Sequence, residues 1–222
     1  MHIKPFQIAI QNNIGMIMSA HIQYPNVTTK KIIGKDGKQY DPPATLSDEI
    51  ITGKLKGELG FKGVVSTDGM HMQGVTLIYD EPQAAAAALE AGCDMLCMPV
   101  ASTSSATFNN DMDAVISYIK TEMTSGKLTE ARLKDAVMRV LRLKADYGIL
   151  DYNPDDFTLE KAQATVGNAD HKAIEKNIAN KSITCVKNNN DTLPLRLEEN
   201  ENVLFLCTHS SLQPNESTIA MA

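Results

Sequence analysis

The carboxylate of Asp68 is the side chain whose setting most favours chemistry. It follows the apolar run at residues 63–67 and precedes Gly69-Met70-His71-Met72. A short β-branched run bounded by glycine is typical of a buried parallel strand, and barrel enzymes carry their chemistry at the carboxyl ends of such strands. An aspartate–glycine pair after a strand is more often a turn or a helix cap, so position alone leaves both interpretations open.

His21 is the second candidate. It ends an apolar run at residues 15–22, which we expect to be the strand preceding that of Asp68. Because parallel strands end at the same edge of a sheet, both side chains are expected to face one pocket. The alternative is a structural histidine that is hydrogen-bonded to nearby backbone.

The elements that position these residues are predicted from apolar spacing. Strands are expected at residues 15–22, 63–67 and 95–98, with a long polar loop at 26–42. Helices are expected in five segments. The first runs from an N-cap at Ser47, through Ile51, Leu55 and Leu59, to Gly60, and the second from Pro82 and Gln83 through the alanine run to Gly92. The others lie around 115–123, from an N-cap at Thr129 through 133–141, and at 171–183. Strands that alternate with helices favour an α/β fold with a parallel sheet.

Composition sets limits but gives no function. The net charge is -6 and the pI is about 5.4, a balance that provides no electrostatic attraction for nucleic acid or an anionic membrane. We expect no membrane span, and residues 1–5 lack the apolar centre of a signal peptide. The four cysteines, Cys93, Cys97, Cys185 and Cys207, are interpreted as free thiols, which leans weakly toward a reducing compartment. No metal or cofactor is expected.

Three blocks of sequence resemble glycoside hydrolase family 3, specifically its bacterial β-N-acetylglucosaminidase branch. The blocks are Met18-Ser19-Ala20-His21; Pro43-Ala44-Thr45-Leu46-Ser47 leading through Gly60-Phe61-Lys62-Gly63-Val64 to Thr67-Asp68; and Ala91-Gly92-Cys93-Asp94 with Met98-Pro99. They occur in the family's order, and the resemblance continues through residues 182–195.

The resemblance implies an α/β fold that is the C-terminal part of a TIM barrel. Residues 1–150 are similar to its sixth, seventh and eighth strand–helix units, residues 151–165 to a linker, and residues 166–222 to the start of a second α/β domain that includes a strand at 203–207. A full barrel needs eight such units. We therefore expect the chain to be a piece of a longer protein that lacks the N-terminal part of the barrel.

The resemblance also implies a mechanism. Asp68 matches the nucleophile of a retaining exo-β-N-acetylglucosaminidase, which forms a covalent glycosyl-enzyme, and His21 and Met72 match residues that line the sugar site. The branch uses a histidine paired to an aspartate as its acid/base, on a loop that matches no part of this sequence. His71 and Gly69 depart from the family pattern; the glycine is expected to loosen the turn after the nucleophile.

Several alternatives remain open. The expected substrate is N-acetylglucosamine at the end of peptidoglycan fragments or chito-oligosaccharides, but a β-glucosidase, a β-xylosidase or a phosphorolytic variant fits the same motifs. A metal-dependent hydrolase that uses His21, Asp68 and His71 is a second class of enzyme, but the sequence offers no firm third ligand and no acidic partner for it. A non-enzymatic, partner-dependent fragment is the third class, and we expect little or no turnover by these 222 residues alone. Compartment, whether cytoplasmic or secreted by a bacterium, and oligomeric state are open.

Overall fold

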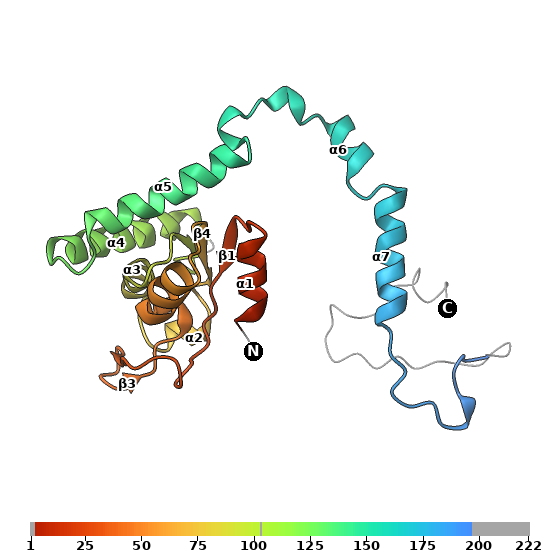
Figure 1. Cartoon of the computed structure of the whole chain (residues 1–222), viewed down its shortest axis with the longest axis horizontal. Helices are drawn as coiled ribbons and strands as arrows, with labels where there is room; N and C mark the ends of the chain where they lie inside the picture. Colours follow the sequence, from red (N-terminus) through yellow and green to blue (C-terminus); the bar gives the residue numbers. More distant parts are fainter. Residues whose placement is uncertain (1–2, 103, 197–222) are drawn as a thin grey trace. The chain divides into compact units, whose positions relative to one another are not determined.

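Three parallel strands form the centre of the first part of the chain. The computed structural model describes residues 3–102 and 104–196, and the chain divides into two units, Met1–Asn153 and Pro154–Ala222. In the first unit, β4 (Val64–Gly69) lies between β1 (Met16–Met18) and β5 (Met95–Cys97), and all three run parallel (Figure 1). The predicted parallel sheet is confirmed.

Helices follow or precede each of these strands, which confirms the predicted α/β class. They are α1 (Lys4–Gln11), η1 (Ala44–Leu46), η2 (Glu49–Glu58), α2 (Gln73–Thr76), α3 (Glu81–Ala91), α4 (Ser105–Thr124), α5 (Glu130–Asp146) and η3 (Ile149–Asp151). Several ends lie where the sequence predicts them. Gly60 and Gly92 take left-handed conformations with φ of 69° and 117°, and the Thr129 side chain accepts from the Arg132 N–H.

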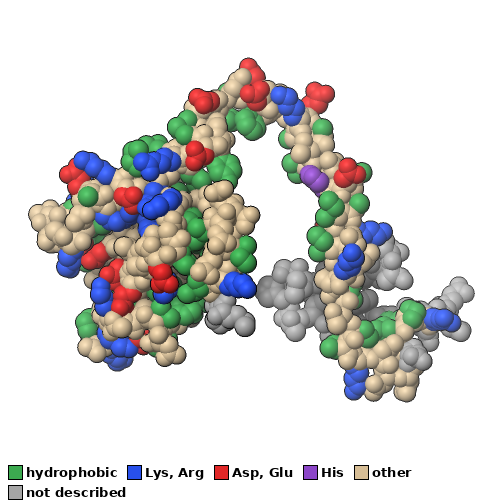
Figure 2. Space-filling model, in the orientation of Figure 1, with side chains coloured by type: hydrophobic (Ala, Val, Ile, Leu, Met, Phe, Trp, Pro, Cys, Tyr) green, Lys and Arg blue, Asp and Glu red, His purple; other side chains and the backbone are tan. Residues whose placement is uncertain are grey.

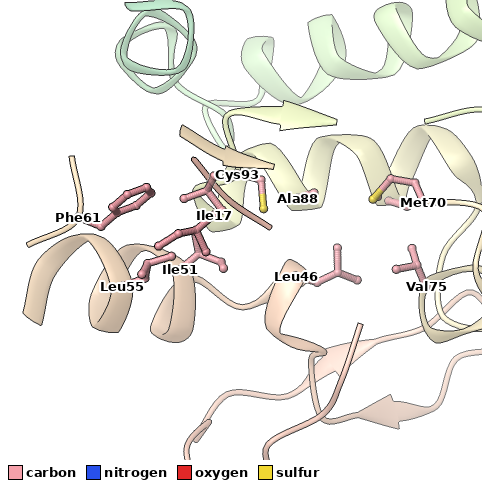
Figure 3. Close-up of a cluster of buried hydrophobic side chains, with 11 residues drawn as sticks. Ile17, Leu46, Ile51, Leu55, Phe61, Met70, Val75, Ala88 and Cys93 are labelled. Carbon is pink, nitrogen blue, oxygen red and sulfur yellow. The ribbon is translucent and has the colours of Figure 1, made fainter. Parts of the chain in front are cut away.

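The core lies between the sheet and the helices η2 and α3 (Figure 3). Ile17 and Val65 come from the strands, Ile51 and Leu55 from η2. The alanine run predicts a closely packed helix, and four of its members in α3 are buried: Ala84, Ala85, Ala86 and Ala88. These small side chains let α3 pack closely against α4, η1 and strand β5.

Four local features differ from the sequence prediction. The strand predicted at 15–22 is only Met16–Met18, because residues 20–22 turn away to pair with residues 43–45. The polar loop contains a short hairpin, β2 (Ile32–Ile33) with β3 (Gln39–Tyr40). Helix η2 is a π-helix with its N-cap at Asp48, although Ser47 Oγ still accepts from the Ile50 N–H. Helices α1 and α2 were not predicted.

A buried ionic network lies at the amino end of β4. The Asp94 side chain is fully buried, pairs with Lys56 at 2.7 Å and with Arg132, and accepts from the Val65 N–H at 2.9 Å. Arg139 of α5 donates to the Gly63 carbonyl at 3.0 Å. These contacts join η2, β4 and α5 at the end of the strand opposite to Asp68. On the face of this unit seen in Figure 2, acidic and basic side chains are intermingled.

The described part of the second unit is helical. It contains η4 (Pro154–Asp156), α6 (Leu159–Thr165), α7 (Ala169–Ser182) and η5 (Asn189–Asp191). Helix α7 confirms the helix predicted near residues 171–183, whereas the predicted strand at 203–207, with Cys207, lies outside the described residues. In the described part of the chain, no helix is long and apolar enough to cross a membrane.

Candidate active site

Asp68 lies at the carboxyl end of β4, one residue before the strand ends. Its side chain is half-buried, and Oδ1 accepts from the Gly69 N–H at 2.7 Å. Among residues 3–102 and 104–196 no cation pairs with this carboxylate, since every ion pair found there involves other acids. Within this described part of the chain, a substrate that approaches Asp68 would therefore displace no ion pair.

Main-chain contacts with β5 hold both sides of Asp68. The fully buried Thr67 side chain accepts from the Cys97 N–H at 2.9 Å, and the Met70 N–H donates to the Cys97 carbonyl at 3.0 Å. The register between β4 and β5 shifts between Ser66 and Gly69. Such irregularities in strand pairing are common beside active sites, where they redirect a side chain.

His21 contacts the residue that follows Asp68. Its Nε2 lies 3.0 Å from the Gly69 carbonyl oxygen, and its Nδ1 lies 2.9 Å from Thr45 Oγ1. The structure therefore places His21, three residues beyond β1, beside the carboxyl end of β4. That the His21 and Asp68 side chains face one pocket stays a prediction. Because both ring nitrogens have protein partners, a sugar in this site would meet the carbon edge or the face of the imidazole.

Met72 and His71 lie on the loop after β4. The Met72 N–H donates to the same Gly69 carbonyl at 3.1 Å, and the Met72 side chain is 44% exposed. The exposed His71 ring folds back toward β4, so that a Cβ on Gly69 would be 2.7 Å from its Cε1. Gly69 is both the last residue of β4 and the first residue of the turn that the Met72–Gly69 hydrogen bond closes, and its missing side chain makes room for the His71 ring. The expectation that Gly69 loosens the turn stays a prediction.

Met98 is a neighbour of the site that sequence reasoning did not select. It follows β5 with a φ of 46°, a left-handed conformation that is uncommon for a non-glycine residue. Its side chain is 56% exposed, and its Cε would lie 3.7 Å from a Cβ on Gly69. Strained backbone of this kind clusters at ligand sites. The only sequence signal was its membership of the Met98-Pro99 pair in the third family block.

The described residues contain no group of three or more His, Cys, Asp or Glu side chains placed to hold a metal ion. Of the three residues in the metal-dependent alternative, His21 already uses both nitrogens on Thr45 and Gly69. The donor set therefore does not support that alternative. Cys93, Cys97 and Cys185 are free cysteines.

A carboxylate at the carboxyl end of a parallel strand, within repeated strand–helix units, defines the site of a barrel-type α/β enzyme. Residues 1–143 match the glycosyl hydrolase family 3 N-terminal domain. The chain therefore belongs to glycoside hydrolase family 3, whose N-terminal domain has a TIM-barrel-type fold, and the three parallel strands are part of such a barrel.

Individual relatives agree with this assignment. Beta-hexosaminidase A of Pseudoalteromonas piscicida is 32% identical over 86% of this chain and 31% of its own length. A beta-N-acetylglucosaminidase/beta-glucosidase of Cellulomonas fimi is 28% identical over 90% of this chain and 33% of its own length. The chain thus spans about a third of the length of these curated relatives.

Solved structures show the same similarity in three dimensions. A beta-glucoside phosphorylase superposes with a TM-score of 0.69 at 29% identity, over 86% of this chain and 33% of its own. A family 3 beta-N-acetylglucosaminidase from Paenibacillus sp. strain FPU-7 superposes with a TM-score of 0.54 at 31% identity, over 67% of this chain and 25% of its own.

Proposed function

We propose that this chain carries the nucleophile of a retaining β-N-acetylglucosaminidase that removes terminal N-acetylglucosamine from peptidoglycan fragments or chito-oligosaccharides. The observation that carries the proposal is the half-buried Asp68 carboxylate at the carboxyl end of β4, with no cation paired to it among the described residues. The names of the Pseudoalteromonas and Paenibacillus relatives support the choice of sugar.

The proposed reaction has two steps. A carboxylate oxygen of Asp68 attacks the anomeric carbon as the bond to the leaving oxygen breaks, and a general acid protonates that oxygen. Water then attacks the same carbon, the ester bond to Asp68 breaks, and the water proton passes to the general base. We assign the acid/base role to none of these 222 residues, and losing that role typically costs about 10²–10⁴-fold.

The neighbours of Asp68 have supporting parts in this proposal. His21 and Met72 line the sugar site, and each also holds the Gly69 carbonyl, through Nε2 and through the main-chain N–H respectively. The exposed Met98 side chain adds an apolar surface near Gly69, on the side where a Cβ of that residue would lie.

The proposal predicts that Asp68 can be labelled even where turnover is absent. Fluoride leaves with little acid assistance, so a 5-fluoro glycosyl fluoride tests the nucleophile without the acid/base. Two such reagents are compared, one derived from N-acetylglucosamine and one from glucose. We expect the N-acetylglucosamine reagent to add one sugar to the peptide that contains Asp68, measured by mass spectrometry. Asp68→Asn should abolish the label, because an amide is a poor nucleophile.

Asp113→Asn is the matched control, since Asp113 is an exposed aspartate of α4 outside the site. It should be labelled as the wild type is. Faster labelling by the glucose reagent would move the proposal to the β-glucosidase alternative. Sugar attached to another residue, or no label from either reagent, would contradict the assignment of Asp68.

Phosphorolysis is the second candidate, favoured by the similarity to the beta-glucoside phosphorylase. It uses the same first step, but phosphate rather than water takes the sugar from Asp68. Adding phosphate to the isolated glycosyl-enzyme separates the two: a sugar 1-phosphate product supports phosphorolysis, and free sugar at an unchanged rate supports hydrolysis.

A further inference from the structure

A short row of hydrogen bonds leads away from the nucleophile into the core. Ser19 Oγ lies 2.9 Å from Thr45 Oγ1, Thr45 Oγ1 lies 2.9 Å from His21 Nδ1, and His21 Nε2 lies 3.0 Å from the Gly69 carbonyl oxygen. Ser19 is buried and Thr45 is fully buried. The row therefore connects a water-excluded part of the core to the peptide bond between Gly69 and Met70, one residue beyond Asp68.

The donor and the acceptor of each hydrogen bond in the row can be worked out from the bond between His21 and the Gly69 carbonyl. The Gly69 carbonyl only accepts, so Nε2 of His21 must carry a proton. In a neutral imidazole the other nitrogen is then an acceptor, and the Thr45 hydroxyl must donate to it. With its proton used in this way, Thr45 Oγ1 accepts the proton of the Ser19 hydroxyl.

The backbone of Thr45 is held from several sides. The Thr45 N–H donates to the Ala20 carbonyl at 3.2 Å, and the Cys93 thiol donates to the Thr45 carbonyl at 3.6 Å. Burial raises the pKa of Cys93 to about 12, so the thiol keeps its proton.

His21 is fixed from its other side by α2, where a Cβ on Gly74 would lie 2.7 Å from the Cβ of His21.

We propose that Thr45 is a positioning residue for the nucleophile: its hydroxyl donates to Nδ1 of His21 and so keeps the ring proton on Nε2, and this N–H fixes the Gly69 carbonyl beside Asp68. The Pro-Ala-Thr-Leu-Ser block thereby has a physical role, which is to place the Thr45 hydroxyl within hydrogen-bonding distance of His21. The catalytic consequence rests on the proposed function of Asp68, whereas the protonation pattern does not.

The first test is the protonation state of His21 in the wild-type chain. Histidine-labelled protein is examined by two-bond ¹⁵N–¹H correlation near neutral pH, with His21→Gln to assign the signals. We expect one protonated and one unprotonated nitrogen, with the proton on Nε2. A proton on Nδ1, or on both nitrogens, would overturn the proposal whether or not the chain reacts with sugars.

The second test replaces the hydroxyl by a methyl group of similar size. Thr45→Val should release His21 into a mixture of protonation patterns and slow the labelling of Asp68 by about 10–100-fold, the order of loss that follows from a small misplacement of a reacting group. Thr45→Ser keeps the hydroxyl and should keep both the His21 pattern and the labelling rate. A valine variant unchanged in both respects would overturn the proposal.

His21→Gln covers the case in which the valine variant fails to fold. A glutamine amide has both a donor for the Gly69 carbonyl and an acceptor for Thr45, so His21→Gln should lose less of the labelling rate than His21→Leu, which offers neither group. Equal losses in the two variants would contradict the role of these two hydrogen bonds. If the wild type is not labelled at all, the proposed nucleophile role of Asp68 is wrong. The ¹⁵N–¹H spectrum of His21 still decides whether the hydrogen-bond pattern is correct.

Discussion

At the scale of single residues, the buried thiol of Cys93 makes the free energy of unfolding depend on pH. Its pKa is raised from 9.0 to about 12 by burial. The unfolded chain therefore loses this proton near pH 9, while the folded chain keeps it. The stabilisation is complete below pH 9 and is lost as pH rises toward about 12.

This difference predicts that the free energy of unfolding falls by about 1.4 kcal/mol per pH unit above pH 9 because of Cys93. Urea unfolding at a series of alkaline pH values measures the slope. Cys93→Ala should remove that part of the slope, and Cys185→Ala, which changes an exposed cysteine, should leave it intact. Equal slopes in both variants would show that the buried thiol does not titrate as described.

Asp68 and His21 were selected as candidates because a carboxylate or a histidine at a predicted strand end is visible in sequence, and their expected roles came from the family resemblance. Thr45 and Thr67 were not identified, although both are fully buried and hydrogen-bonded next to the site. Their roles depend on which backbone lies opposite them, and a threonine in a sequence gives no sign of that. Met98 was missed for a similar reason, since its left-handed φ is a property of the folded backbone.

At the scale of elements, strand β4 is anchored at its amino end by the Asp94 network. Burial lowers the pKa of Lys56, and the carboxylate of Asp94 opposes this effect. Arg132 depends on the same carboxylate, with its side chain only 16% exposed. Both cations would be left in a largely water-excluded position if the charge on Asp94 were removed.

We therefore expect Asp94→Asn to lower the free energy of unfolding by about 3–5 kcal/mol, as measured by urea denaturation. The amide keeps an acceptor for the Val65 N–H, so the loss reports the charge. Glu130→Gln is the control on α5, because the Glu130–Lys134 pair is exposed and should contribute less than about 1 kcal/mol. Similar losses in the two variants would contradict the importance of burial.

Helices with regular apolar spacing were predicted, and the cap at Thr129 on α5 was correct, whereas η2 has its N-cap at Asp48 rather than Ser47. Elements defined by long-range pairing were predicted less well. The strand at 15–22 is shortened because residues 20–22 pair with residues 43–45, a contact between distant parts of the chain. The π-helical winding of η2 was not predicted, since four-residue apolar spacing also suits an α-helix.

At the scale of the molecule, the first unit leaves apolar surface and strand edges uncovered. No residue of α1 is buried, and Phe6 and Ile8 are 45% and 50% exposed. Within residues 3–102 and 104–196, β1 and β5 each pair with β4 alone. An apolar face beside an unpaired strand edge favours association with another chain.

The isolated polypeptide should therefore self-associate as its concentration rises, measured by sedimentation velocity. Replacing Phe6 and Ile8 by lysine should shift the distribution toward monomer. Replacing the exposed Gln7 and Gln11 by lysine adds the same charge to α1 without removing apolar area, and should have a smaller effect. A wild-type chain that remains monomeric at high concentration would contradict the prediction.

We also propose, from the resemblance, that residues 151–165 link the barrel portion at 1–150 to a second domain at 166–222. The division of the chain at Asn153 and Pro154 supports this proposal, and α6 occupies the last part of that segment.

The position of Asp68 and the Asp94 network at opposite ends of β4 has a consequence for protein engineering. The Val65 N–H donates to Asp94, and Val65 is only three positions before Asp68 on the same strand. Libraries directed at the loops after β1, β4 and β5 can therefore vary the surroundings of Asp68 while the ionic network preserves the scaffold. Adaptation to heat can be sought separately in η2 and α5, with little effect on the geometry around Asp68.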